Sequence, residues 1–515
     1  MRISTFLLCT CLLLVFPATG HTQEVERVEP PFWWTGFEHS ELQLLIHGNN
    51  ISLLTPSIDV PGISISRIVR VESPNYLFLY LDIGVDAEPT AFDIVFEDGD
   101  FSVSHTYELR PRNPDPDHVK GFTSADTMYL IMPDRFANGD PDNDEFYFLD
   151  DKLKRDDPYG RHGGDLKGIS DNLDYIADMG FTSVWLNPIL ENAMPIWSYH
   201  GYATTDYYLV DPRFGTNEQY RQLVADMKDR GIGMVMDLIV NHIGTGHWWM
   251  DDLPTHDWLN FQDAFEPTTH KRTTNMDPYA TEYDKVRHAD GWFVEAMPDL
   301  NQRNPLLADY LVQNAIWWIE YVGLQGIRID TWPYPDKHFM TEWTRRIMQE
   351  YPDFNMVGEE WSENPAVVSY WQRGKQNHDG YVSYLPSLFD FPVQAALMRA
   401  LMGDVASWNG VWTPLYELVG TDFLYPNPMS LVIFPDNHDM NRIYTQLEEN
   451  DDLYKMAMVY YATMRGIPQF FYGDEILASH MGTSSHGELR SDFPGGWEGD
   501  TKNAFTGDGL TGKER

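Results

Sequence analysis

Two carboxylates carry the strongest chemical signal in this chain. Asp330 ends the run GIRID at 326–330, and Glu359 follows a second short apolar run at 355–357. Each run has the length and bounding residues of a buried strand. Two acids that face one bond are what cleavage of a glycosidic linkage requires, one as nucleophile or base and the other as acid.

Two further motifs follow apolar runs in the same way. They are DLIVNH at 237–242 and FPDNHD at 434–439. If all four strands are parallel members of one barrel, their carboxyl ends meet at one rim, where such barrels place their active sites. The sequence therefore predicts one site that gathers acids, two histidines and an arginine.

The composition restricts the class of protein. A length of 515 residues allows two to four domains, and 43% hydrophobic residues with 14% aromatic residues indicate a globular chain. The net charge of −42 disfavours nucleic acid and anionic membranes as partners. Cations and neutral molecules such as sugars remain possible binding partners. An acidic surface most often has no binding role and is simply hydrated.

Residues 1–20 resemble a secretory signal peptide, with a basic start, an apolar core at 6–16 and small residues at 18–20. A buried N-terminal helix is the alternative. Cys9 and Cys11 both lie in this segment, so we expect a mature chain without disulfides. We expect an exported protein, periplasmic or alternatively secreted, without membrane insertion, since no other stretch is long and apolar enough to span a bilayer.

The pattern of elements changes along the chain. Residues 24–112 hold short alternating runs separated by turn residues, which predicts an N-terminal antiparallel β-sandwich. Strand and helix patterns alternate through 120–515, which indicates an α/β fold, a (β/α)8 TIM barrel. The stretch at about 241–304 lacks clear helix periodicity and is interpreted as an inserted lid subdomain. The tail after 467–471 shows no evident last barrel helix.

The ordered motifs resemble the α-amylase family, glycoside hydrolase family 13, over roughly residues 120–500. The segments GYATTDY at 201–207 and GIP at 466–468 match as well. The N-terminal sandwich resembles that of the neopullulanase and cyclomaltodextrinase branch, in particular its periplasmic members in starch-using Bacteroidetes. Asp299 stands where that branch usually has lysine and the oligo-1,6-glucosidase branch has aspartate. The family's C-terminal β-domain is expected to be missing from this chain.

The resemblance assigns roles to the paired acids. Asp330 would be the nucleophile that forms a covalent glycosyl–enzyme intermediate, with Arg328 holding it ionised. Glu359 would be the general acid and then the base. Glu360 is its competitor, but neighbouring strand residues point to opposite faces, so only one can face the site. The resemblance selects Glu359.

The remaining site residues are also implied by the resemblance. Asp439 would be the third carboxylate and would bind sugar hydroxyls. His242 and His438 would donate hydrogen bonds to the sugar at the cleaved bond. Tyr202 would stack on that sugar, with His200 beside it. A structural role in the core is the alternative for each aromatic or histidine residue.

A separate oxygen-rich loop, NGDPDND at 138–144, is followed by a second turn at 163–165. Oxygen ligands without cysteine or histidine suit Ca²⁺, although the loop alone could be a solvated acidic turn. The resemblance implies a structural calcium. Its ligands would be Asn138, Asp140, Asn143, Asp144, the carbonyl of Gly163 and Asp165.

We therefore expect a retaining α-glucan hydrolase that cleaves α-1,4 bonds, with α-1,6 bonds as a second linkage. Starch oligosaccharides, cyclodextrins and pullulan are the expected substrates. A glucan-binding protein without catalysis, a transglycosylase and a sucrose- or trehalose-converting enzyme are the alternatives. The resemblance also allows a homodimer formed through the N-terminal domain.

Overall fold

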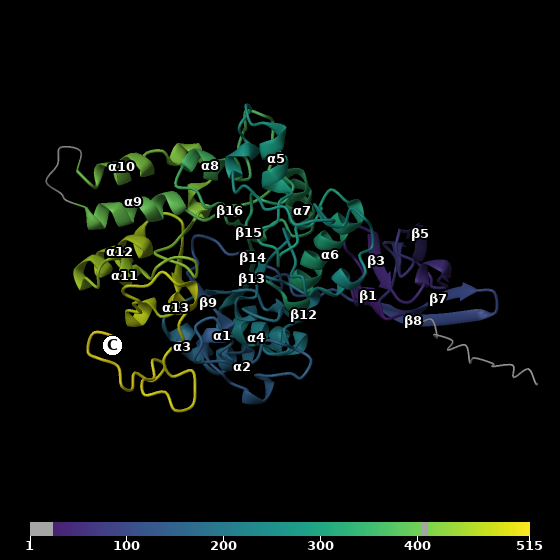
Figure 1. Ribbon diagram of the computed structural model, residues 1–515, viewed down its shortest axis with the longest axis horizontal. Coiled ribbons are helices and arrows are strands. Elements are labelled where there is room, and N and C mark those ends of the chain that lie inside the picture. Colours follow the sequence, from purple (N-terminus) through teal and green to yellow (C-terminus); the bar gives the residue numbers. More distant parts are fainter. Residues whose placement is uncertain (1–23, 404–409) are drawn as a thin grey trace, which may run out of the picture.

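The computed structural model describes residues 24–403 and 410–515, and it shows a β-sandwich joined to a larger barrel (Figure 1). The predicted signal peptide at 1–20 lies outside the described residues. Among residues 24–403 and 410–515, no helix is both long and apolar enough to cross a membrane.

The N-terminal domain packs two four-stranded sheets, counted within residues 24–403, in the orders β1-β3-β6-β5 and β2-β8-β7-β4. The strands are β1 (Arg27–Glu29), β2 (Trp33–Trp34), β3 (Glu41–His47), β4 (Thr55–Ser57), β5 (Ile63–Arg70), β6 (Tyr76–Ile83), β7 (Thr90–Asp98) and β8 (Phe101–Arg110). The predicted antiparallel sandwich is confirmed, with β2 and β8 as a parallel pair.

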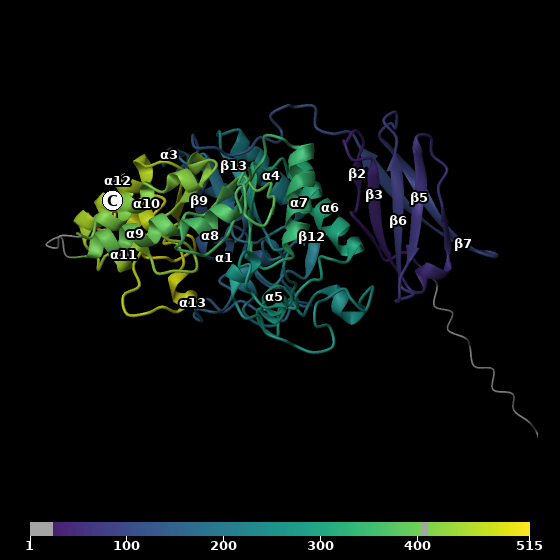
Figure 2. The same ribbon diagram turned by 90° about the horizontal axis from the view of Figure 1, so that it is seen from above.

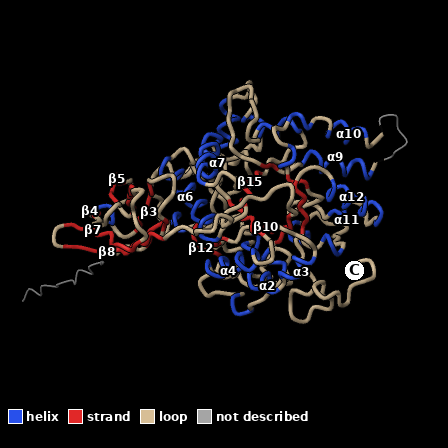
Figure 3. Tube along the Cα trace, turned by 180° about the vertical axis from the view of Figure 1, so that it is seen from behind, coloured by secondary structure: helices blue, strands red, loops and turns tan. Residues whose placement is uncertain are grey.

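The larger domain is a barrel of eight parallel strands, counted over the described ranges (Figure 3). The strands are β9 (Met128–Ile131), β10 (Ser183–Leu186), β13 (Gly233–Leu238), β14 (Gly326–Ile329), β15 (Asn355–Gly358), β16 (Ser387–Leu388), β17 (Val432–Ile433) and β18 (Ile467–Phe471). A parallel bridge between Phe389 and Val432 joins the two ends of the sheet. The predicted (β/α)8 barrel is confirmed.

Helices surround this ring of strands in the Cα trace of Figure 3. They are α1 (Pro133–Phe136), α2 (Leu166–Asp171), α3 (Leu173–Asp178), α4 (Asn217–Lys228), α5 (Glu282–Ala289), α6 (Pro305–Val322), α7 (Lys337–Glu350), α8 (Pro365–Tyr370), α9 (Phe391–Met402), α10 (Thr413–Val419), α11 (Ile443–Gln446), α12 (Asp451–Thr463) and α13 (His486–Leu489). Residues 166–179 have the apolar spacing of one continuous helix, but the structure divides it at Asn172, whose side chain donates to the Gly168 carbonyl (2.8 Å). Such a local bond competes with helix continuation.

The inserted segment leaves the barrel after β13 and returns at α6. Backbone bridges pair His242 with Asp299 and Leu259 with Leu300, so the segment's two ends lie together at the barrel rim. Helix α5 lies inside it and was not predicted from the sequence. A short hairpin of β11 (Leu190–Glu191) and β12 (Asp206–Val210) extends the rim nearby.

The sandwich lies beside α6 (Figure 2). The backbone N–H of Gln43 in β3 donates to the side-chain oxygen of Gln313 in α6 (2.8 Å). The side-chain nitrogen of Gln313 donates in return to the backbone carbonyl of Gln43 (2.7 Å). Arg27 in β1 forms an ion pair with Asp206 in β12 (2.6 Å) and contacts the buried Glu29 (3.1 Å). Because the carboxyl groups of Glu29 and Asp206 are buried beside a partly exposed Arg27, the contact between the two domains is sensitive to their protonation.

Candidate active site

Arg328 lies at the centre of the strand-end cluster and is almost fully buried. Its Nη1 donates to Asp330 Oδ1 (2.8 Å) and to Asp237 Oδ1 (2.9 Å), and its Nη2 donates to Glu359 Oε2 (2.8 Å). The register of β13 against β14 places Asp237 opposite Arg328. One guanidinium therefore orients the two predicted catalytic acids towards a common space.

Glu359 accepts a second hydrogen bond from the backbone N–H of Thr331 (3.0 Å). Thr331 has a φ of 45°, a left-handed conformation that is uncommon for a branched residue. Burial raises the pKa of the Glu359 carboxyl to about 8, in spite of the opposing charge of Arg328. Glu359 is therefore mainly protonated at neutral pH and can act as an acid.

Glu360 points to a different environment from Glu359. Its Oε2 accepts from Trp371 Nε1 (2.8 Å), and its Oε1 lies 3.5 Å from Arg272 Nε. Burial raises the pKa of Glu360 to about 7. The two adjacent acids thus have separate partners, and Glu359 is the one that shares Arg328 with Asp330.

Asp439 is held by its neighbour in the sequence, His438, and by Arg490, which lies 51 residues further along the chain. His438 Nε2 lies 3.1 Å from Asp439 Oδ2, and Arg490 Nη2 donates to Asp439 Oδ1 (2.7 Å). Burial opposes ionisation, but His438 and Arg490 outweigh it and hold the pKa of Asp439 below its usual range. Arg490 was not predicted, because it lies in a loop without a strand or a motif to mark it.

The predicted aromatic and histidine residues form one layer beside these acids. The rings of Tyr202 and His438 stack with centroids 5.3 Å apart and planes at 8°. The Tyr202 hydroxyl donates to Asp237 Oδ2 (2.9 Å), and His242 Nε2 lies 3.1 Å from the Tyr202 carbonyl. His200 stacks on Tyr202 at 5.9 Å, and burial lowers the pKa of His200 to about 3, so this ring is neutral. The structure therefore brings every predicted catalytic and sugar-binding residue into one cluster.

The residues predicted to hold calcium lie on adjacent turns that follow β9. Asn138 Nδ2 donates to Asp144 Oδ1 (2.9 Å), and the Asp140 N–H donates to Asp165 Oδ2 (2.9 Å). Gly163 has a φ of +86°, and a Cβ at this position would lie 2.5 Å from Asp144 Oδ1. Only glycine fits so close to the carboxylate in this backbone conformation.

The donor set of this loop fits a hard cation because it consists of amide, carbonyl and carboxylate oxygens. The described residues contain no group of three or more His, Cys, Asp or Glu side chains placed to hold a metal. In that part of the chain, the buried Oδ1 atoms of Asn138 and Asn143 have no hydrogen-bond partner. Burial raises the pKa of Asp144 to about 6 and also raises that of Asp165. A cation would serve as partner for the amide oxygens and favour the ionised carboxylates.

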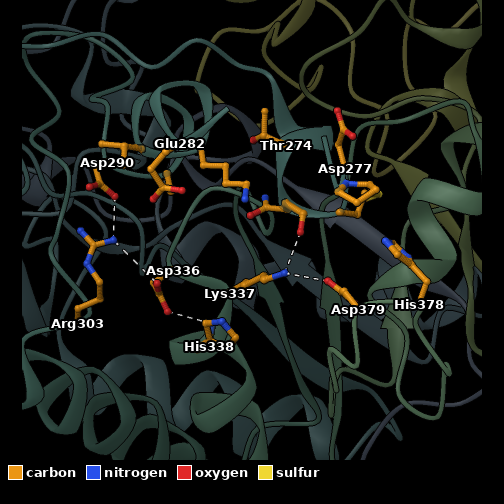
Figure 4. Close-up of a pocket in the computed structure, with 16 residues that line it drawn as sticks. Thr274, Asp277, Glu282, Asp290, Arg303, Asp336, Lys337, His338, His378 and Asp379 are labelled. Atoms are coloured by element: carbon orange, nitrogen blue, oxygen red, sulfur yellow. Dashed lines mark hydrogen bonds and ion pairs between the residues drawn. The ribbon is translucent and has the colours of Figure 1, made fainter. Parts of the chain in front are cut away.

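A cavity of about 560 Å³ lies apart from these residues, between α5 and the start of α7 (Figure 4). Lys337 bridges its wall by donating to the Asn275 carbonyl (2.8 Å) and to Asp379 (3.1 Å). Arg303 pairs with Asp290 on the opposite side (2.9 Å). Its lining, as far as the structure describes it, contains none of the predicted catalytic or sugar-binding residues.

A barrel rim that presents an acid, a second carboxylate and a shared arginine has the architecture of a glycoside hydrolase. The model of the alpha amylase catalytic domain matches residues 130–488, and the model of the cyclomaltodextrinase N-terminal domain matches residues 27–113. The chain therefore belongs to the α-amylase family, glycoside hydrolase family 13.

Individual relatives agree with this placement. Neopullulanase 2 of Thermoactinomyces vulgaris is 32% identical over 68% of this chain and 56% of its own length. A cyclomaltodextrinase of Thermoanaerobacter pseudethanolicus is 30% identical over 69% of this chain and 58% of its own. The solved α-amylase of Geobacillus thermoleovorans with acarbose aligns with a TM-score of 0.59 and 32% identity, covering 73% of this chain and 76% of that one. The chain thus spans a little over half of those two curated relatives.

Proposed function

We propose that the protein is a retaining α-glucan hydrolase that cleaves α-1,4 bonds, with α-1,6 bonds as a second linkage. Starch oligosaccharides, cyclodextrins and pullulan are the proposed substrates. The observation that carries this proposal is that Arg328 donates hydrogen bonds to both Asp330 and Glu359, and burial raises the pKa of Glu359 so that it can act as the acid. The names of the relatives, a neopullulanase and a cyclomaltodextrinase, favour the same substrates.

In the first step, an Asp330 oxygen attacks the anomeric carbon while Glu359 transfers its proton to the glycosidic oxygen. The bond between that carbon and oxygen breaks, and the leaving sugar departs as a neutral alcohol. A covalent ester then links the remaining sugar to Asp330. Arg328 favours this step because its charge keeps Asp330 ionised and oriented for attack.

In the second step, the Glu359 carboxylate accepts a proton from a water molecule. The water oxygen attacks the anomeric carbon, the ester bond to Asp330 breaks, and Glu359 is protonated again. Two inversions give net retention of configuration. A sugar hydroxyl in place of water would give transglycosylation by the same residues.

Substrate binding is assigned to the layer beside the acids. Tyr202 offers a ring for stacking on the sugar at the cleaved bond, and His200 lies against it. Asp439 accepts hydrogen bonds from sugar hydroxyls as an ionised carboxylate. His242 and His438 donate to hydroxyls of the same sugar, and such bonds accelerate the reaction when they strengthen in the transition state.

We also propose that the turns after β9 bind a structural Ca²⁺. Its ligands would come from Asn138, Asp140, Asn143, Asp144, the Gly163 carbonyl and Asp165. Bound calcium would hold the two turns together and supply no chemistry to the bond-breaking steps. Thermal unfolding with calcium and with a chelator tests this proposal, because a ligand of the folded state raises the midpoint.

Export to the periplasm is a further proposal, and it depends on the sequence at 1–20. N-terminal sequencing of the protein from a periplasmic fraction tests it. A mature protein that begins shortly after residue 20 would support export. A full-length protein found in the cytoplasm would refute it.

The first test of the proposed function is product analysis on cyclodextrin, pullulan and soluble starch. The purified chain should release short oligosaccharides, and Asp330→Asn should abolish their release. Panose or maltose from pullulan would identify the linkage that is cleaved. Glucan binding without turnover by the folded chain would instead support a glucan-binding protein on the same barrel.

A further inference from the structure

Arg27 in β1 contacts two separate segments of the barrel rim. Its Nη1 donates to Asp206 Oδ2 in β12 (2.6 Å). Its guanidinium carbon also lies over the indole ring of Trp248, 4.7 Å from the ring centroid. Trp248 belongs to the 3-10 turn Trp248–Asp251 in the first part of the inserted segment. One side chain of the sandwich therefore holds both β12 and the inserted segment.

The first of these two segments carries Tyr202. Asp206 is the first residue of β12, lies four residues after Tyr202 and is buried. The Thr205 N–H donates to the Glu191 carbonyl in the paired strand β11 (2.8 Å), so the chain that leads into β12 is held from that side as well. A shift of Asp206 would therefore be carried to the Tyr202 ring, which is proposed to stack on the sugar.

The second segment carries His242 and reaches Trp248 six residues later. It is bonded to the first segment, because the Gly244 N–H donates to the Thr204 carbonyl (2.9 Å). In addition, His242 Nε2 lies 3.1 Å from the Tyr202 carbonyl. The two segments thus lie against each other where they carry their sugar-binding residues, and a contact that holds both of them fixes their spacing.

The sandwich surrounds the Trp248 ring with further side chains. Tyr76 in β6 stacks on this ring at a centroid distance of 6.0 Å with planes at 16°, and His47 in β3 lies 5.3 Å away. The Tyr76 hydroxyl donates to the Asp252 carbonyl directly after the turn (2.7 Å). The inserted segment is therefore docked on the sandwich, and Arg27 connects this docking site to β12.

We propose that Arg27, a residue of the sandwich, is a positioning residue for the active site of the barrel. It acts through Tyr202 and His242, whose relative placement it fixes by holding the two segments that carry them. This inference rests on the proposed function. Displacement of binding groups by about 1 Å can cost as much as 100-fold in rate, so a remote contact that sets their spacing affects turnover.

The shape of the guanidinium group suits this role. A guanidinium can bond a carboxylate along its edge while its face packs on an aromatic ring, whereas an ammonium group is a point charge. Arg27→Lys should therefore keep an ion pair with Asp206 and lose the packing on Trp248. Its activity should lie between that of wild type and that of a variant without either contact.

Removing Arg27 alone would leave two buried carboxyl groups without their cation and would destabilise the fold. The rim variant therefore combines Arg27→Met with Glu29→Gln and Asp206→Asn, so that the buried charges disappear together. Loss of the brace can then be measured in a folded protein.

Arg112 provides the matched control. It also joins the two domains by pairing with two buried carboxyl groups, those of Glu320 (3.0 Å) and Glu350. Glu320 lies near the end of α6, just before β14 begins, so this contact is at the opposite end of the barrel from the acids. The base variant combines Arg112→Met with Glu320→Gln and Glu350→Gln.

The first measurement compares kcat/KM on a cyclodextrin at similar thermal midpoints. The rim variant should lose about tenfold, while the base variant should stay within about twofold of wild type. In a His242→Ala background, the rim substitutions should cost about threefold or less, because part of their effect acts through that residue. Equal losses in the rim and base variants, or the full tenfold loss in the His242→Ala background, would overturn the role of Arg27.

Hydrogen–deuterium exchange without any glucan separates this inference from the proposed function. Peptides from 200–210 and 241–250 should exchange about tenfold faster in the rim variant and at the wild-type rate in the base variant. Unchanged exchange in the rim variant, or equal acceleration in both variants, would refute the positioning role even if the wild type hydrolyses glucans. Faster exchange in the rim variant alone would support it even if the wild type lacks hydrolase activity, which would refute only the proposed function.

Discussion

The raised pKa of Glu359 makes the pH dependence of turnover the sharpest prediction. With a pKa of about 8, this carboxyl is about nine-tenths protonated at pH 7. With the ordinary value of 4.5, about 0.3% would be protonated, so burial increases the acid-competent fraction about 300-fold. We therefore expect kcat/KM on a cyclodextrin to be level towards pH 7 and to fall about tenfold per pH unit well above pH 8.

The neighbouring acid provides the control. Glu359→Gln cannot donate the proton and should lose activity at every pH. Glu360→Gln makes the same change one residue away, at a carboxyl group that accepts a hydrogen bond from Trp371. This variant should keep the alkaline limb of the kcat/KM profile near pH 8. An alkaline limb near pH 5 would refute the argument that burial raises this pKa. An alkaline limb that shifts in Glu360→Gln would show that Glu360, and not Glu359, is the general acid.

Three further predictions concern charge, pH and backbone. Arg490→Met leaves the Asp439 carboxylate without its guanidinium, so kcat/KM should fall about 100-fold, and an unchanged value would contradict this role. Burial raises the pKa of Glu29 to about 7, above its ordinary value of 4.5. The folded protein therefore binds this proton more tightly, and about 3 kcal/mol of the free energy of unfolding is present below pH 4.5 and lost as the pH rises through 7. Chemical denaturation at pH 4 and pH 8 should show this difference, and Glu29→Gln should remove it. Gly163→Ala should lower stability by about 1–3 kcal/mol, because its Cβ would clash with Asp144 and φ is positive; a thermal midpoint equal to wild type would argue against the close approach.

Most barrel strands could be predicted because their signal is local. The runs at 128–131, 183–186 and 467–471 coincide with β9, β10 and β18. Strand β16 was missed, because Ser387 and Leu388 are too few to show a pattern and become a strand only through pairing with β15. Asn172 likewise divides a helix that its apolar spacing predicts as continuous.

The candidate site shows the same division. The motifs at the strand ends led to Asp330, Glu359 and Asp439. Arg490 lies in no motif, and it contacts Asp439 only because its loop meets the barrel rim. Pattern alone could not have found it, since long-range contacts leave no local spacing in the chain.

The sequence by itself determined the alternation of most barrel strands and helices, the acids at the strand ends and the family, because alternation, turn residues and motifs are properties of neighbouring residues. The tertiary structure alone decided which partners those acids have. Arg328 bonds to Asp330 and Glu359, while Glu360 is turned to Trp371. The protonation of Glu359 follows from burial, which depends on residues brought together from the whole barrel and is therefore absent from any local pattern.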